Sequence, residues 1–125
     1  MEKNWKNKNF FNALKNSING IKFAVKSEIN LKIQLVIAII VIIFSLILDI
    51  NIIQKLFVYL SIFLVLICEL INTAIEKTVD FITEEYSEKA KIIKDVSSGA
   101  VLISAINSVV IGILVFGNEI INIIK

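Results

Sequence analysis

The sequence predicts an all-α membrane protein, with one amphipathic helix at the membrane interface and three transmembrane helices. Hydrophobic residues make up 57% of the 125 residues, charged residues make up 19%, and the mean hydropathy is +0.84. A soluble chain of this length has too little interior to hide so much apolar side chain. Ile, Leu and Val come in long runs and not in strict alternation, so the spans are expected to be helices.

We expect a single membrane domain over residues 1–125. The length suits one domain, there is no Pro, and the four Gly are scattered, so no linker is indicated. The chain has no His, which excludes a histidine general base and histidine metal ligands. The single Cys68 cannot form a disulfide within the chain, and we interpret it as a packing residue.

An amphipathic helix is predicted over about residues 8–27. Its apolar side chains fall within an arc of roughly 100°, and Lys and Asn occupy the other side. The apolar side carries Phe10, Phe11, Leu14, Ile18, Ile21 and Val25, and the polar side carries Lys8, Lys15, Lys22, Lys26, Asn12, Asn16 and Asn19. This pattern is typical of a helix lying in the membrane interface. An ordinary helix packed on the aqueous side of the bundle is the alternative.

Three apolar runs predict the membrane helices, over about residues 31–48, 54–83 and 96–118. Asp49–Asn51 makes a tight connection after the first. The second helix is longer than one bilayer crossing, so its later end is expected to project into water. The charged segment 84–95 is interpreted as a connector, and the third span, which follows it, contains no charge.

The distribution of Lys predicts the orientation. Residues 1–32 carry seven Lys and residues 77–95 carry four, whereas the 49–55 connection has only Lys55 and the C-terminal tail only Lys125. Cytoplasmic loops are enriched in Lys and Arg. The N-terminus and the 77–95 segment are therefore expected to be cytoplasmic, and the C-terminus outside.

A stripe of acids begins directly after an uncharged run that ends at Cys68. On one helix, Glu69, Glu76 and Asp80 fall within roughly 20° of one line, with Asn72 about 60° away. A carboxylate in hydrocarbon costs on the order of 2.5–3.5 kcal/mol, so the stripe should face protein, a cation or water. A helix that has already left the bilayer, with the stripe as a solvated face, is the alternative.

The predicted topology brings further polar groups to the level of this stripe. Glu28 and Glu76 are suitably placed ligands for Mg²⁺, which prefers oxygen and usually arrives with substrate phosphates. Glu69 is the deepest acid, and a carboxylate partly removed from water suits general-base catalysis. Lys94 can neutralise phosphate. Asp95 is predicted to cap the third span, whose first N–H groups would favour an anion.

These groups fit phosphoryl transfer to a hydroxyl presented from the bilayer. The sequence contains no Walker loop and no set of protein-kinase motifs, so a nucleotide site would be of an unusual, compact kind. A proton- or cation-coupled transporter would use similar intramembrane carboxylates.

Two motifs resemble those of the bacterial membrane diacylglycerol kinase family, which includes the undecaprenol kinases. The first is Glu69-Leu-Ile-Asn72-Thr-Ala-Ile-Glu76-x-x-Val-Asp80, and the second is Ala90-Lys91-x-x-Lys94-Asp95-x-x-x-Gly99-Ala-Val-Leu. The amphipathic N-terminal helix and Glu28 before the first span also fit. The resemblance covers nearly the whole chain.

The resemblance implies a homotrimer in the bacterial plasma (inner) membrane that transfers the γ-phosphoryl group of Mg·ATP to a lipid hydroxyl. Its sites would lie between neighbouring protomers. Glu69 matches the catalytic base, Glu28 and Glu76 the Mg²⁺ ligands, and Asp80 a supporting acid. The remaining nucleotide- and lipid-binding positions implied are Asn72, Glu85, Tyr86, Lys94, Asp95 and Ser98. No nucleic acid partner is expected.

The chain departs from the family at two places. All 13 basic residues are Lys, whereas several members carry an Arg in the N-terminal helix. Gln34 stands where some members have an acid. The form of the second motif is more similar to the undecaprenol kinase branch, although diacylglycerol stays open as the acceptor.

Two hypotheses compete with a lipid kinase. A small transporter or channel would use Glu69 or Glu76 to carry a proton or cation, and would move ions without ATP. A structural or holin-like membrane protein would not depend on the acids at all.

Overall fold

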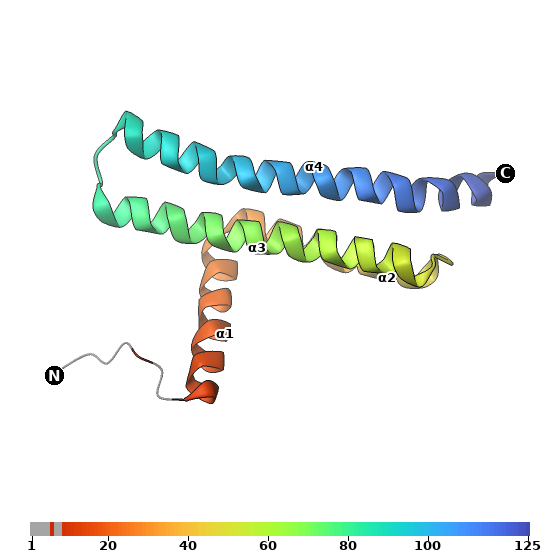
Figure 1. Ribbon diagram of the computed structural model, residues 1–125, viewed down its shortest axis with the longest axis horizontal. Coiled ribbons are helices and arrows are strands. Elements are labelled where there is room, and N and C mark those ends of the chain that lie inside the picture. The colour runs from red at the N-terminus through yellow and green to blue at the C-terminus, as the bar shows by residue number, and fades with distance from the viewer. Residues whose placement is uncertain (1–5, 7–8) are drawn as a thin grey trace.

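The computed structural model describes Lys6 and residues 9–125, and it is all-helical over these residues. The four helices are α1 (Phe10–Ser27), α2 (Ile29–Ile47), α3 (Ile52–Ile82) and α4 (Glu88–Ile124). Figure 1 shows α2, α3 and α4 running alongside one another, with α1 crossing their direction. Lys8, where the first helix was predicted to begin, lies outside the described residues.

Helices α2, α3 and α4 are each long and apolar enough to cross a membrane. This confirms the predicted all-α class with three candidate spans. Helix α3 lies between the other two and packs against both, most extensively against α4. α2 and α4 are therefore held apart, with α3 as the shared wall of the space between them.

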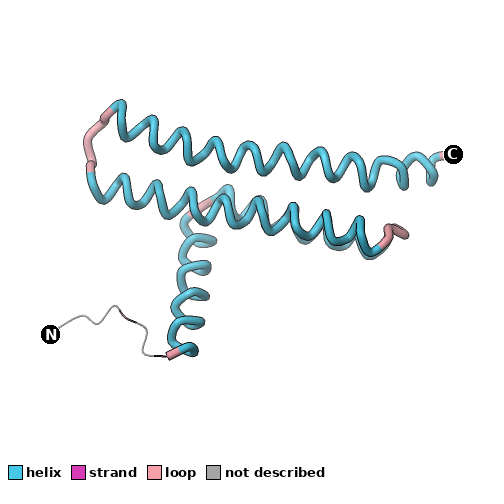
Figure 2. The backbone as a smooth tube through the Cα atoms, viewed as in Figure 1, coloured by secondary structure: helices cyan, strands magenta, loops and turns pink. Residues whose placement is uncertain are grey.

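Local capping explains where the helices begin and end. The Asn9 side chain accepts a hydrogen bond of 2.9 Å from the backbone N–H of Asn12 at the start of α1. Asn51 and Gln54 form a reciprocal capping box at the start of α3, which satisfies two backbone N–H groups. Figure 2 shows the short loops that connect the capped helices.

Glu28 alone joins α1 to α2. Its backbone is extended (φ −114°, ψ 114°), and it is both the last cap of α1 and the first of α2. α1 buries only Ala24, while its apolar residues Phe10 and Phe11 stay 76% and 77% exposed. Among the described residues, most of the apolar side of α1 therefore stays uncovered.

The prediction that Asp95 caps the third span is wrong. α4 begins at Glu88, with Ser87 as its N-cap, so Asp95 lies two turns inside the helix. Most of the intervening residues, Lys, Ala and Ile, are compatible with a helix, and their charges do not interrupt it. The backbone N–H groups of Val96–Ser98 consequently serve the helix and are not free to bind an anion.

A buried apolar cluster lies at the end of the bundle remote from α1. It contains Ile50, Val58 and Val115, from the α2–α3 loop, α3 and α4. Beside it, the Ser45 hydroxyl is fully buried and lies 3.2 Å from the Tyr59 hydroxyl. This cluster fixes the three helices together at one end and leaves polar side chains to join them nearer α1.

Candidate functional site

Buried polar side chains mark one region of α3. Glu69, Asn72 and Thr73 are 2%, 6% and 4% exposed, although they follow directly on an apolar stretch. Polar side chains at such depth need hydrogen-bond partners, particularly in hydrocarbon. The partners of Glu69 and Asn72 come from the helices on either side of α3, whereas Oγ1 of Thr73 is buried without a hydrogen-bond partner among the described residues. This region is therefore not a solvated face.

Glu69 is joined to α2. The side-chain amide of Gln34 donates a hydrogen bond of 3.1 Å from Nε2 to Oε2 of Glu69. A buried carboxylate that accepts a hydrogen bond is far less costly than one left alone. Gln34 thus stabilises the carboxylate at this depth and fixes the orientation of its plane.

Asn72 joins α4 to the next acid of the stripe. The Ser97 hydroxyl donates a hydrogen bond of 2.7 Å to Oδ1 of Asn72, and Nδ2 of Asn72 donates one of 3.3 Å to Oε1 of Glu76. Because Oδ1 is bound by a donor, the amide group is committed to the Glu76 carboxylate. Three side chains from two helices therefore form one directed chain of hydrogen bonds.

Glu28 reaches the same level of α3 from the α1–α2 junction. Its Oε1 lies 3.5 Å from Nζ of Lys77, the residue after Glu76. Over the described residues, no group of three or more carboxylate or thiol side chains gathers as a ready metal site. A metal held by Glu28 and Glu76 would need water or phosphate oxygens to complete its coordination, which is the usual situation for Mg²⁺.

Lys94 pairs with Asp80 at the outer end of the stripe. Its Nζ lies 2.5 Å from Oδ1 of Asp80, and it belongs to the part of α4 that precedes the uncharged span. The hydrogen bond from Lys94 to Asp80 raises the pKa of Lys94 above 10.5, with a smaller contribution from the negative charge of Glu76. Lys94 is therefore a positive charge at neutral pH, held beside two acids.

Four predicted site residues lie apart from the buried group. Asp95 pairs with Lys91 on the surface of α4, and the Ser98 hydroxyl donates to the carbonyl of Asp95. Glu85 and Tyr86 lie in the exposed loop between α3 and α4. No hydrogen bond or ion pair among the described residues joins any of the four to Glu69 or Asn72.

Sequence reasoning missed Ser97 and Lys77 as partners of the site and recognised Gln34 only as a departure from the family. Ser97 is difficult to recognise from the sequence because the charged segment before it resembles a connector. Continuing the helix back to Ser87 would have placed Lys94 and Ser97, three residues apart, on one side of α4. Both in fact contact α3.

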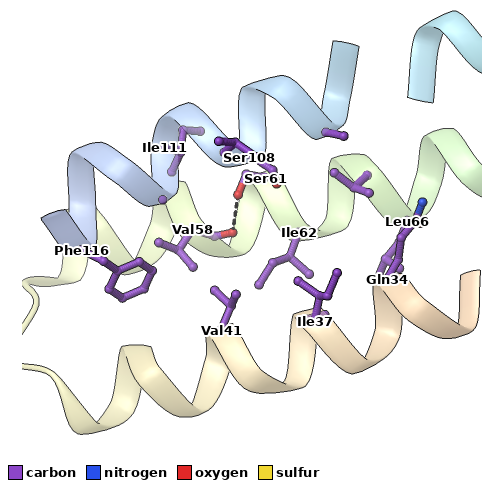
Figure 3. Close-up of a pocket in the computed structure, with 15 residues that line it drawn as sticks. Gln34, Ile37, Val41, Val58, Ser61, Ile62, Leu66, Ser108, Ile111 and Phe116 are labelled. Carbon is purple, nitrogen blue, oxygen red and sulfur yellow. Dashed lines mark hydrogen bonds between the residues drawn. The ribbon is translucent and has the colours of Figure 1, made fainter. Parts of the chain in front are cut away.

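An apolar cavity of about 390 Å³ opens between α2, α3 and α4. Gln34 lies at one end of it, near Leu66, and Phe116 at the other (Figure 3). Between them the lining is almost entirely aliphatic, with Ser61 and Ser108 as the other polar residues. Oε1 of Gln34 is buried without a hydrogen-bond partner among the described residues. The cavity therefore ends at Gln34, the residue that donates a hydrogen bond to the Glu69 carboxylate.

Comparison with known proteins shows two similar relatives. A segment of 48 residues is 52% identical to the undecaprenol kinase of Bacillus subtilis (strain 168), and covers 38% of this chain and 39% of that protein. A segment of 49 residues is 51% identical to a diacylglycerol kinase of Synechocystis sp., and covers 38% of this chain and 28% of that protein. The matches thus span about two fifths and just over a quarter of the two relatives.

A family model extends the similarity to most of the chain. The model for prokaryotic diacylglycerol kinase matches residues 15–116, a range that includes every buried polar residue named above and confirms the resemblance found in the sequence. On this match, the chain belongs to the prokaryotic diacylglycerol kinase family.

Proposed function

We propose that this protein is a lipid kinase that transfers the γ-phosphoryl group of ATP to the hydroxyl of a membrane lipid, either undecaprenol or diacylglycerol. The observation that carries the proposal is the apolar cavity that ends at Gln34, hydrogen-bonded to the buried Glu69. An apolar chain fits the aliphatic lining, and a hydroxyl at the Gln34 end of the cavity would lie next to Glu69. Family membership supports the same reaction class.

Glu69 is proposed as the general base. The lipid hydroxyl gives its proton to the Glu69 carboxylate while its oxygen forms a bond to the γ-phosphorus. The bond from that phosphorus to the β–γ bridging oxygen breaks, and ADP leaves with the electron pair. Oε2 of Glu69 is held by Gln34, so Oε1 is the oxygen proposed to take the proton.

Glu28 and Glu76 are proposed to hold Mg²⁺, and Asn72 is proposed to serve the nucleotide site beside them. The donor set fits, because two carboxylates supply oxygen ligands and leave coordination positions for water and phosphate. Asn72 orients the Glu76 carboxylate through the hydrogen bond of 3.3 Å. Bound Mg²⁺ would offset the negative charge of the phosphates. Glu28 would exchange its contact with Lys77 for the metal.

The nucleotide is proposed to bind on the water side of Glu76, where Lys94 supplies a positive charge for the phosphates. Glu85, Tyr86, Asp95 and Ser98 lie on the same connector and first turns of α4, and are proposed contacts at the nucleotide and lipid edges. Their separation from the buried group within one chain supports a site completed by a neighbouring protomer.

We propose that the protein works as a homotrimer in the bacterial plasma membrane, with its N-terminus and the α3–α4 loop in the cytoplasm. The uneven distribution of Lys supports this orientation. The uncovered apolar side of α1 supports a position in the membrane interface.

The deciding experiment presents membranes that contain the protein with γ-labelled ATP, Mg²⁺ and either undecaprenol or diacylglycerol. Transfer of label to one lipid establishes the class and the acceptor together. Absence of label in both lipids would refute the reaction proposed. ATP-independent ion flux in liposomes that Glu69→Gln abolishes would instead favour the transporter hypothesis, which the family match does not favour.

A further inference from the structure

One cation beside the proposed Mg²⁺ site has no role in the mechanism above. Lys77 follows Glu76 directly in the chain, and its Nζ lies 3.5 Å from Oε1 of Glu28 at the α1–α2 junction. The Ser27 hydroxyl lies 3.5 Å from the same oxygen. Among the described residues, Lys77 is the only cation within ion-pair distance of Glu28. Lys77 thus holds a carboxylate that the Mg²⁺ site is proposed to use.

The contact between Lys77 and Glu28 is suited to exchange. The side chain of Lys77 is 51% exposed and that of Glu28 is 21% exposed, so water screens the pair. An ion pair of this kind stabilises a fold only weakly, and over the described residues no second contact holds the Lys77 ammonium group. The flexible stem of a lysine lets the ammonium group move while the helix stays in place.

Lys94, the other cation beside the acidic stripe, is held more firmly. Its Nζ lies 2.5 Å from Oδ1 of Asp80, against 3.5 Å for Lys77 and Glu28. Lys94 approaches from α4, whereas Lys77 reaches toward the α1–α2 junction, and α3 lies between α2 and α4. The two cations therefore flank the stripe from opposite sides, and Lys77 is the one that a new anion can draw away more easily.

Metal binding would change what Lys77 faces. The Glu28 carboxylate would then be shared between a divalent cation and the ammonium group of Lys77, and two positive charges on one carboxylate repel each other. Lys77 would need another anion to replace Glu28. Mg²⁺ usually arrives with substrate phosphates, whose oxygens accept strong hydrogen bonds from a lysine. The phosphates are thus the natural second partner of Lys77.

We propose that Lys77 is a phosphate-binding residue that holds Glu28 until Mg²⁺ and the nucleotide bind together. Without nucleotide, Lys77 occupies Glu28 and opposes the binding of a metal ion alone. With nucleotide, its ammonium group leaves Glu28 and donates hydrogen bonds to the phosphate oxygens. Lys77 thereby couples the metal site to the phosphate site. The inference rests on the proposed function for the location of both sites.

The test measures binding by the full chain in a neutral detergent, so it does not depend on turnover. Mn²⁺ alone is titrated by electron paramagnetic resonance of the free ion, and β,γ-methylene-ATP with Mg²⁺ is titrated by calorimetry. Lys77→Met should bind Mn²⁺ alone roughly 2- to 5-fold more tightly, the range expected for removing a partly exposed ion pair. It should bind the Mg²⁺–nucleotide roughly 10- to 150-fold more weakly, as for a lost hydrogen bond to a charged group.

The opposite signs of the two effects identify the role of Lys77. A lysine that only supports the fold would weaken both kinds of binding when replaced, and one that only repels the metal would strengthen both. Either result, or no change in nucleotide binding, would overturn the proposal. Lys77→Gln, a polar replacement, should repeat the pattern of Lys77→Met, so the result does not depend on one variant folding.

Two further variants serve as controls. Lys55→Met removes the same charge at the other end of α3 and should change neither kind of binding. Lys77→Arg keeps the positive charge and should retain most of the affinity for the Mg²⁺–nucleotide. Equal helix content by circular dichroism verifies that each variant is folded.

The lipid kinase assay on the wild-type protein separates this inference from the proposed reaction. Wild-type protein that phosphorylates a lipid, with nucleotide binding that ignores Lys77, would contradict the role of Lys77 alone. Opposite effects of Lys77→Met on metal and nucleotide binding, in a protein that phosphorylates neither lipid, would contradict the kinase reaction alone. Wild-type protein that binds no Mg²⁺–nucleotide would refute both.

Discussion

The side-chain amide of Gln34 on α2 donates a hydrogen bond of 3.1 Å to the carboxylate of Glu69 on α3, and its own carbonyl oxygen has no partner among the described residues. Gln34 thus holds the proposed base and also lines one end of the cavity. This hydrogen bond connects the cavity, where the apolar chain of a lipid is proposed to bind, with Glu69, the group proposed to take the proton of the lipid hydroxyl.

Removing this amide should impair turnover. Gln34→Leu keeps an apolar side chain in the cavity wall but deletes a hydrogen bond to a charged group, which typically contributes about 1.5–3 kcal/mol. We expect kcat/KM for the lipid to fall roughly 10- to 150-fold. Ile37→Leu, one turn along the same wall, is the matched control. A Gln34→Leu enzyme as active as this control would show that the hydrogen bond does not serve the reaction.

Glu69→Gln should separate catalysis from nucleotide binding. The substitution keeps shape and volume but cannot accept the hydroxyl proton, so turnover should fall on the order of 10²- to 10⁴-fold. Binding of Mg·ATP, measured by titration calorimetry, should change little. Glu76→Gln and Glu28→Gln should show the opposite pattern, with Mg²⁺-dependent nucleotide binding itself weakened. A reversed outcome would exchange the roles of base and metal ligand.

Ser97→Ala should act through Asn72. Without the Ser97 hydroxyl, Oδ1 of Asn72 is a buried acceptor left without its donor, a loss of about 1–3 kcal/mol. The amide is then free to rotate away from Glu76, so we expect a higher KM for Mg·ATP and a higher Mg²⁺ requirement, with a smaller change in kcat.

Two variants distinguish this positioning role from a loss of packing. Ser104 is also buried, at 3% exposure against 7% for Ser97, but it donates only to the carbonyl of Val101 in its own helix. Ser104→Ala should therefore leave the Mg²⁺ requirement unchanged. Ser97→Thr retains the hydroxyl and should therefore show the wild-type Mg²⁺ requirement. A common effect of both alanine variants would indicate packing alone.

The ion pair of Lys94 and Asp80 predicts a pH dependence of stability. The pKa of Lys94 is raised in the folded state, so the pair stabilises the fold below pH 10.5. That contribution declines as the pH rises through the raised pKa, because the folded state then loses the proton that the pair had held. Thermal unfolding in detergent should show that the melting temperature falls more between pH 9 and pH 11 for the wild type than for Asp80→Asn. Equal losses would show that the pair contributes nothing.

Much of the fold follows from periodicity and hydropathy. The apolar runs predict α2 and α3 to within a few residues, and the two-sided pattern of α1 is evident from the spacing of its Lys, Asn and apolar residues. Hydropathy alone predicts too late a start for α4, because a charged segment before an apolar run resembles a loop. Ser87 is a good N-cap, and a run of Glu, Lys, Ala and Ile after it forms helix regardless of its charge.

The site was predictable only in part. The stripe of Glu69, Asn72 and Glu76 lies on one helix, so spacing alone reveals it. Ser97 and Gln34 lie on other helices, and their pairing with α3 depends on the rotation and depth of each helix. Those quantities come from packing between helices and not from periodicity within one.

The single-residue junction at Glu28 gives the molecule a mechanical property. With no loop to absorb movement, any reorientation of α1 has to be taken up by the backbone torsions of Glu28 itself. The carboxylate proposed to hold the metal thus belongs to the one residue that joins α1 to α2. A change in the angle between α1 and α2 would displace this carboxylate directly, so the orientation of α1 and the geometry of the proposed site are coupled.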